Sequence, residues 1–178
     1  MHQHDDAALA PDGEPLDPNP FGPDNPCFGC GPTHPFGLHL AFARRADVIT
    51  TRFLPRGDLQ GPPGVMHGGL VMTVADELGA WTVLGLLERF GFTAAFEGRL
   101  REPMRVGVAA RGEGTLADGA SPESVKDARI VKVDVKLHQE ERLVFSGKYT
   151  FALMDEAGAE RLLRGPLPDT WRRFARRP

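Results

Sequence analysis

The first clear pattern along the chain is an alternation of apolar and polar residues. Apolar side chains stand at Leu38, Leu40 and Phe42, which is the period of a β-strand with one buried face. The β-branched run 48–54 predicts a second strand paired with the first, with residues 44–47 as the turn between them. These segments predict the start of an antiparallel sheet.

One long apolar segment, residues 70–90, has the length and composition of a helix. It is rich in Leu, Ala and Met and is too long for a single strand. Leu70, Val74 and Leu78 recur at helical spacing, and apolar residues continue nearly all round the helix. We therefore expect this helix to be buried, and we expect Gly91 to end it as a C-cap.

Beyond the helix the period of the pattern returns to two. The segments with this strand pattern are 93–101, 105–116, 131–137 and 143–153. Two strands, a helix and four strands predict an α+β domain, in which an antiparallel sheet of about six strands wraps around one long central helix.

The 178 residues fit one domain with two tails. Residues 1–26 hold six prolines and five aspartates, which predicts a flexible or extended N-terminal arm. The folded domain is expected over 27–154. Residues 155–178 contain six arginines and are expected to form a separate C-terminal extension.

The net charge and the cysteine content make some classes of protein less favoured than others. A formal net charge of −3 gives no reason to expect nucleic-acid binding. Cys27 and Cys30 are the only cysteines, and the first residues lack the basic and apolar regions of a signal peptide, so we expect a cytoplasmic protein. Asp76 and Glu77 stand near the centre of the apolar segment, which argues against a membrane span.

Two motifs in this sequence suggest a family. His67-Gly68-Gly69 opens the predicted helix, and Asp76-Glu77 follows nine positions after the histidine. The run CFGCGPTHPFGLHLAF, residues 27–42, precedes them. Together they resemble the hotdog-fold thioesterases of the phenylacetate-pathway type over about residues 27–153. In that family an asparagine is common where this chain has His34.

The resemblance implies a hotdog fold and an acyl-CoA thioesterase, a hydrolase that acts at sites shared by two subunits of a homodimer or a dimer of dimers. We expect no cofactor and no metal. The resemblance also gives Thr93 the place of the family's strand threonine, which orients water or the carboxylate. A hydroxyl suits this task because it donates and accepts hydrogen bonds at once.

Thioester hydrolysis needs donors for the oxyanion that forms on the carbonyl oxygen. The first amides of a helix have no partners within the helix, and the helix dipole favours negative charge there. We predict the amide of Gly69 as this donor, with that of Gly68 as the alternative. His67 is expected to orient or contact the substrate.

The reaction also needs a group that activates water or attacks the carbonyl. Asp76, in a nearly apolar helix, is the predicted catalytic carboxylate, as general base or as nucleophile. It lies seven residues beyond Gly69, about 10 Å along the helix axis. One carbonyl carbon cannot contact both residues in one subunit, so the spacing predicts a symmetric dimer with antiparallel helices.

Other side chains have alternative interpretations. Arg99 and Arg101, with Arg105, can hold the phosphates of coenzyme A or form a solvated face. Glu77 points about 100° away from Asp76 around the helix and is given a structural role.

Three other functional classes fit the sequence less well. A zinc site formed by the cysteine pair with His34 and His39 is disfavoured, because His39 alternates with apolar residues in a predicted strand. A non-catalytic acyl-CoA-binding hotdog module has no need of both Asp76 and Thr93. A hydratase would need an acid–histidine pair on the helix, which this chain lacks.

Overall fold

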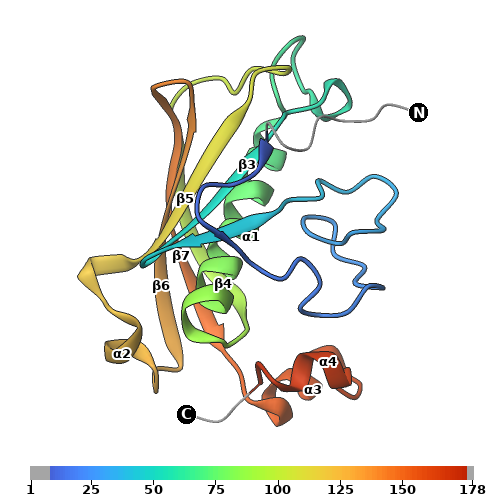
Figure 1. The fold of residues 1–178 in the computed structure, drawn as a ribbon, viewed down its shortest axis with the longest axis vertical. Coiled ribbons are helices and arrows are strands. Elements are labelled where there is room, and N and C mark those ends of the chain that lie inside the picture. Colours follow the sequence, from blue (N-terminus) through green and yellow to red (C-terminus); the bar gives the residue numbers. More distant parts are fainter. Residues whose placement is uncertain (1–8, 176–178) are drawn as a thin grey trace.

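The computed structural model describes residues 9–175, which form a seven-stranded antiparallel sheet with one long helix against one face (Figure 1). The strand order is β1-β2-β3-β5-β6-β7-β4, so β4 and β1 form the two edges. Residues 1–8 of the predicted arm and 176–178 of the predicted extension lie outside the described residues. The strands are β1 (Glu14–Pro15), β2 (Phe42–Arg45), β3 (Val48–Phe53), β4 (Gly91–Leu100), β5 (Ala110–Leu116), β6 (Ile130–Gln139) and β7 (Arg142–Leu153).

Helix α1 (Gly68–Leu87) is the central helix of the domain. Val74 and Leu78 are fully buried in its contact with the sheet. Gly79 allows a close approach, since a Cβ there would lie 2.9 Å from the ring of Phe151. The predicted α+β class, a sheet around one long helix, is confirmed. The strand that the sequence pattern missed is β1, which pairs with β2 and lies in the proline-rich arm, where no alternation marks it.

The ends of the helix differ from the prediction. The helix begins at Gly68 and ends at Leu87. Glu88 is the C-cap: it adopts the left-handed conformation with φ 50°, and its amide donates to the carbonyl of Leu84. Gly91 instead begins β4. The predicted glycine cap was wrong because an ordinary residue took the left-handed position three residues earlier.

The first predicted strand is also shifted, whereas the second, 48–54, agrees with β3 to within one residue. Leu38 and Leu40 are buried as their alternation indicated, but regular pairing begins only at Phe42. The left-handed φ of 51° at His39 interrupts the extended backbone. The amides of Leu38 and Leu40 instead bond to the carbonyls of residues 28 and 29.

The predicted strand 105–116 was wrong in its first half, where residues 101–109 form a loop and β5 begins at Ala110.

Burial of α1 is incomplete, which corrects the expectation of a helix enclosed on every side. One face remains partly open, and its members recur every three or four residues: Gly69, Met72, Thr73, Asp76 and Ala80. By length and composition α1 would also be able to cross a membrane, but 56% of its most apolar window is buried against the rest of the domain. Core helices of globular domains share this property.

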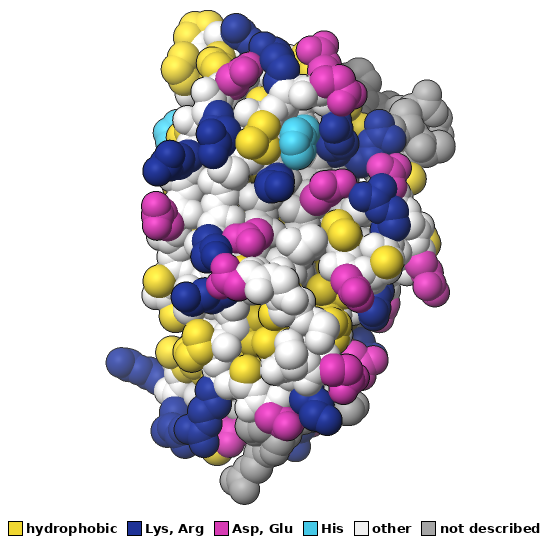
Figure 2. Space-filling model, turned by 90° about the vertical axis from the view of Figure 1, so that its left-hand side faces the viewer, with side chains coloured by type: hydrophobic (Ala, Val, Ile, Leu, Met, Phe, Trp, Pro, Cys, Tyr) yellow, Lys and Arg dark blue, Asp and Glu magenta, His cyan; other side chains and the backbone are white. Residues whose placement is uncertain are grey.

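The opposite face of the sheet is polar. Figure 2 shows basic and acidic side chains interspersed over it, with apolar side chains between them and gathered toward its upper and lower ends. This alternation of buried and exposed residues is typical of antiparallel strands with one solvated face.

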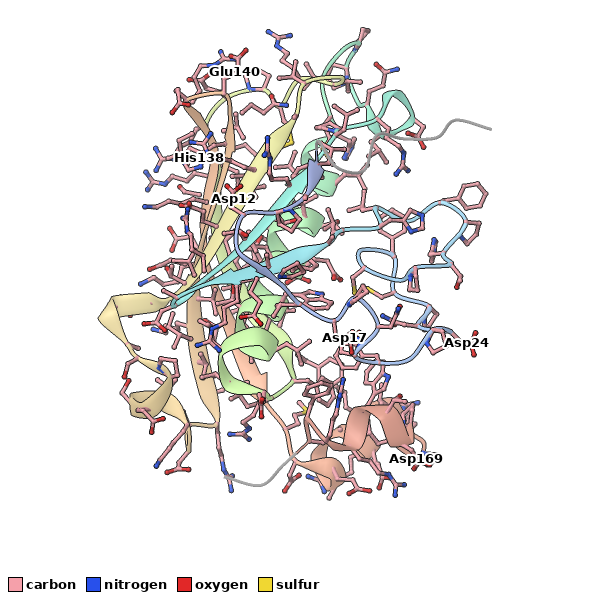
Figure 3. The ribbon with its side chains drawn as sticks, viewed as in Figure 1. Asp12, Asp17, Asp24, His138, Glu140 and Asp169 are labelled. Carbon is pink, nitrogen blue, oxygen red and sulfur yellow. The ribbon has the colours of Figure 1, made fainter. Side chains whose placement is uncertain are left out.

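The arm and the C-terminal segment pack together on the helix side of the sheet (Figure 1). Phe21 contacts the rings of Phe90, Trp171 and Phe174. The hydroxyl of Thr170 donates to the carbonyl of Phe21 at 3.0 Å. In Figure 3, Asp17 and Asp24 mark the arm, and Asp169 marks the helical segment beside it. The short helices are α2 (Pro122–Val125), α3 (Glu156–Leu163), α4 (Asp169–Arg172) and two 3₁₀ turns, η2 (Gly57–Leu59) and η3 (Ala117–Gly119).

Candidate active site

The helix entrance is built by His67, which caps α1. Its Nδ1 accepts a hydrogen bond of 3.0 Å from the amide of Gly69. Its carbonyl accepts the amides of Leu70 and Val71. Among the residues that the structure describes, the amide of Gly68 has no acceptor. The predicted first-choice donor, Gly69, is thus bonded to the imidazole, and Gly68 offers the free N–H.

The loop before the helix is held by a neighbouring loop. The amide of Met66 donates to the carbonyl of Met104 at 2.9 Å, and Val65 pairs with Arg105 in an isolated bridge. The amide of His67 donates to the carbonyl of Leu59. The helix entrance is therefore fixed by backbone bonds from two sides.

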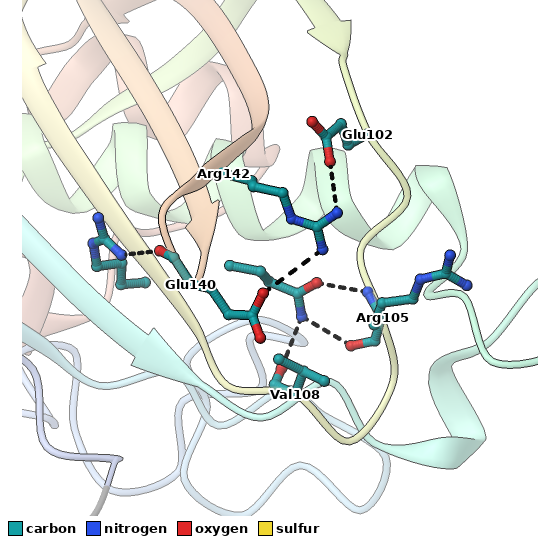
Figure 4. A network of polar contacts seen from close by, with 7 residues as sticks. Glu102, Arg105, Val108, Glu140 and Arg142 are labelled. Carbon is teal, nitrogen blue, oxygen red and sulfur yellow. Dashed lines mark hydrogen bonds and ion pairs between the residues drawn. The ribbon is translucent and has the colours of Figure 1, made fainter.

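That neighbouring loop is in turn anchored by a buried glutamine at the end of β6 (Figure 4). Gln139, which is fully buried, accepts the amide of Arg105 at 2.7 Å and donates to the carbonyls of Arg105 and Val108, both at 2.8 Å. Around it Arg142 forms exposed ion pairs with Glu102 at 3.0 Å and Glu140 at 3.9 Å. The buried amide positions the loop, and the ion pairs lie at its solvent edge.

The structure brings together two of the predicted catalytic residues. The hydroxyl of Thr93 on β4 donates a 2.6 Å hydrogen bond to Oδ1 of Asp76 on α1. Partial burial raises the pKa of Asp76 above its usual range, and the hydroxyl of Thr93 opposes this rise. A half-buried carboxylate with one neutral partner keeps a free oxygen and an increased affinity for a proton, as a general base requires.

Glu77, the neighbour of Asp76, contacts the N-terminal cysteine motif. The thiol of Cys27 donates to Oε1 of Glu77 at 3.0 Å, and Cys30 completes the group. Burial raises the pKa of Glu77 to about 8, and the negative charge that Cys27 carries when its thiol is ionised adds to this rise. A hydrogen bond from Cys30 lowers the pKa of Cys27. Sequence reasoning missed this cluster, although a carboxylate in an apolar helix was a signal that it needs a partner.

The arginines predicted to hold phosphate lie away from the helix. Arg99 and Arg101 line a groove of about 690 Å³ on the solvated face of the sheet, which also contains acidic residues. The Arg101 guanidinium donates to the hydroxyl of Ser146 at 3.0 Å. The two arginines are close to each other but are not joined with Asp76 in one pocket of this chain.

The comparisons with known proteins concern the fold. No protein-family model and no curated protein matches this sequence. A solved thioesterase superfamily protein superposes with a TM-score of 0.60 and 18% identity over 73% of this chain, which spans 60% of that protein's length. A thioesterase superfamily protein from Shewanella loihica PV-4 gives a TM-score of 0.54 and 22% identity over 69% of this chain and 96% of its own.

This chain has the hotdog fold. A third solved structure is a hypothetical thioesterase protein from Streptococcus pneumoniae TIGR4 with coenzyme A; it gives a TM-score of 0.53 and 17% identity over 64% of this chain and 87% of its own.

In this hotdog domain, the hydrogen-bonded pair Thr93–Asp76 and the helix entrance lie on the open face of α1 beside the edge strand β4. Within residues 9–175, β4 bonds to β7 on one side and to no strand on the other. Phe96 and Leu100 on this strand are each more than half exposed, at 54% and 53%. Leu100 lies next to the helix entrance, 3.0 Å from where a Cβ of Gly68 would stand. An unpaired ten-residue edge with apolar side chains can accept another strand.

Proposed function

We propose that this protein is a cytoplasmic acyl-CoA thioesterase that hydrolyses a thioester to free coenzyme A and a carboxylic acid. The observation that carries the proposal is the Thr93–Asp76 hydrogen bond on the open face of α1, the same helix that begins with the free amide of Gly68. A general base and an oxyanion donor are the two requirements of thioester hydrolysis. The phenylacetate-pathway type remains a prediction from the sequence motifs.

In the proposed reaction, Asp76 removes a proton from water as the water oxygen attacks the thioester carbon. The carbonyl oxygen becomes an oxyanion and accepts a hydrogen bond from the amide of Gly68, with Gly69 as a second donor if His67 turns away. The intermediate then reforms the carbonyl as the C–S bond breaks. The leaving thiolate takes up the proton from Asp76, which returns the carboxylate to its starting state.

A covalent route uses the same residues. The Asp76 carboxylate attacks the thioester carbon and expels the thiolate of coenzyme A, which leaves a mixed anhydride for water to hydrolyse. Thr93 then orients the carboxylate for attack. In either route Thr93 acts through Asp76 or through the water beside it.

Two subunits are needed in this proposal. Gly68 and Asp76 are eight residues apart on one helix, or about 12 Å, which is too far for one carbonyl group. A two-fold axis through the open face of α1 would place the entrance of one helix opposite Asp76 of the other. The exposed edge of β4 supports this arrangement, because two such edges can pair into one continuous sheet.

Coenzyme A is proposed as the carrier of the acyl group because the similar Streptococcus pneumoniae structure holds it. Arg99 and Arg101 are the candidate phosphate ligands. Their groove on the solvated sheet face adjoins the β4 edge, so they would flank the proposed subunit interface.

The test is a panel of acyl-CoA substrates with aliphatic and aromatic acyl groups. Free acid should be measured together with free thiol, because Cys27 and Cys30 can react with a thiol reagent. Asp76→Asn should lower kcat by at least about 10²-fold, while Asp127→Asn, an exposed aspartate in the loop after α2, should retain wild-type turnover. Saturable binding of acyl-CoA with no turnover by the wild type would favour the non-catalytic module instead.

A further inference from the structure

Two thiols and a carboxylate with no part in the proposed hydrolysis gather beside Asp76. Cys27 and Cys30 come from the loop that precedes β2, and Glu77 comes from α1. The sulfur of Cys27 lies 3.0 Å from Oε1 of Glu77. One ligand atom from each of the three residues lies within 4.8 Å of the other two. Segments fifty residues apart in the sequence therefore place three potential ligand atoms around one point.

The glycines of the CFGCG motif make this arrangement possible. A Cβ at Gly29 would overlap Cγ of Glu77, so glycine lets the loop come this close to the helix without displacing that side chain. A Cβ at Gly31 would lie 2.4 Å from the carbonyl oxygen of Cys27, where the amide of Gly31 closes the turn at 2.8 Å. The two glycines therefore allow the loop to turn tightly and to pack against Glu77.

A hydrogen-bond donor also reaches the second sulfur atom of the group. The side-chain amide of Asn25, which is only 4% exposed, donates to the sulfur of Cys30 at 3.8 Å. An amide donor of this kind can also bond to a metal-bound thiolate, the form in which cysteine is a ligand.

We propose that Cys27, Cys30 and Glu77 bind one Zn²⁺ ion. Two thiolates and a carboxylate are ligands that zinc accepts, and three protein ligands leave a fourth tetrahedral position for water. In tetrahedral zinc the sulfur and oxygen ligands are about 3.6 Å apart. If the ion replaced the proton between Cys27 and Glu77, the distance from the sulfur to Oε1 would need to increase by only about half an ångström from its present 3.0 Å.

This site differs from the disfavoured zinc site with His34 and His39, because neither histidine takes part. His39 bonds through Nδ1 to the carbonyl of Gly31, and Nδ1 of His34 accepts the amide of Phe36. The ligand that sequence reasoning lacked is Glu77. A bound ion would link the cysteine loop to the turn of α1 that carries Asp76, and would hold that turn in place independently of any substrate.

The test uses the full chain, reduced and stripped of metal with a chelator, and titrated with Co²⁺ as a spectroscopic substitute for zinc. We expect one Co²⁺ per chain, with the thiolate-to-cobalt absorption that marks sulfur ligands, and complete displacement by Zn²⁺. Zinc should also protect both thiols from alkylation by a maleimide. Cys27→Ser and Cys30→Ser should abolish the absorption.

Glu77→Gln should weaken Co²⁺ binding about tenfold or more, while Glu97→Gln, an exposed carboxylate on β4, should leave it unchanged. Equal affinity of the Glu77→Gln variant and the wild type would overturn the three-ligand site. The proposal would also be overturned if the reduced wild-type protein bound no metal, or if Cys27 and Cys30 formed a disulfide instead of binding metal. The Co²⁺ titration of the wild-type protein tests the proposal even if one of the variants fails to fold. No substrate is used, so the result is separate from that of the thioesterase assay.

Discussion

The hydroxyl of Thr93 lies 2.6 Å from the carboxylate of Asp76 and joins an edge strand to the open face of the central helix. Thr93 stands at the irregularity of the β4–β7 pairing, between residues 93 and 95. Bulges re-aim side chains at functional sites. Here the bulge coincides with the residue that turns its hydroxyl toward α1.

Removing this hydroxyl should therefore reduce catalysis more than substrate binding. A hydrogen bond to a charged group contributes about 1.5–3 kcal/mol, so Thr93→Val should lower kcat about 10- to 100-fold with little change in KM. Thr93→Ser keeps the hydroxyl and should restore most of kcat. Equal kcat values for the valine and serine variants would remove Thr93 from the mechanism.

The free amide of Gly68 can be deleted without loss of the helix. Gly68 is the first helical position, where proline is well tolerated, and His67 before it has φ −60° and ψ 131°, a conformation that precedes proline readily. Gly68→Pro should lower kcat about 10²- to 10³-fold, the usual effect of losing an oxyanion donor.

The matched control for this variant is Gly68→Ala. It adds the same Cβ near Leu100 but keeps the N–H. Alanine should retain most of the activity that proline loses. If both variants lose activity equally, crowding at Leu100 would explain the result and Gly69 would become the remaining candidate donor.

His67 should contribute to stability as the N-cap of α1. Its Nδ1 accepts the amide of Gly69. His67→Ala should lower the free energy of unfolding by about 1 kcal/mol, whereas His67→Asn supplies another capping acceptor and should lose much less. Urea unfolding of the three proteins measures this. An asparagine variant no more stable than the alanine variant would contradict the capping role.

The buried amide of Gln139 should matter far more to stability than the ion pairs around it. Gln139→Leu would leave backbone groups of Arg105 and Val108 without partners, at a cost of about 3 kcal/mol or more in unfolding free energy. Arg142→Met removes two exposed ion pairs, and should cost less than about 1 kcal/mol. Comparable losses in urea unfolding would refute this ranking.

Much of the fold was predictable from the sequence, because hydrophobic periodicity reports directly on burial. The six longer strands and the central helix follow from it, as does the buried side of Leu38 and Leu40. The errors lie where local backbone conformation overrides the pattern. Left-handed residues at His39 and Glu88 ended regular structure in places that composition does not mark.

The candidate site was predictable in part for a different reason. An aspartate in an apolar helix needs a partner, and Thr93 was identified by its place in a family motif. That His67 would bond to Gly69 could not be read from the sequence, because it depends on one side-chain torsion. The contact between Glu77 and Cys27 depends on the conformation of an irregular loop. Hydrophobic periodicity does not report on the conformation of such a loop, so the contact could not be predicted.

The central claim is that each site takes its oxyanion donor from one subunit and its carboxylate from the other. Asp76→Asn and Gly68→Pro, each inactive alone, can be unfolded together, refolded as a mixture and assayed. Half of randomly paired dimers would be mixed, and each would contain one site with both native groups, which restores about a quarter of wild-type activity per chain. A mixture as inactive as its two components would contradict the shared site.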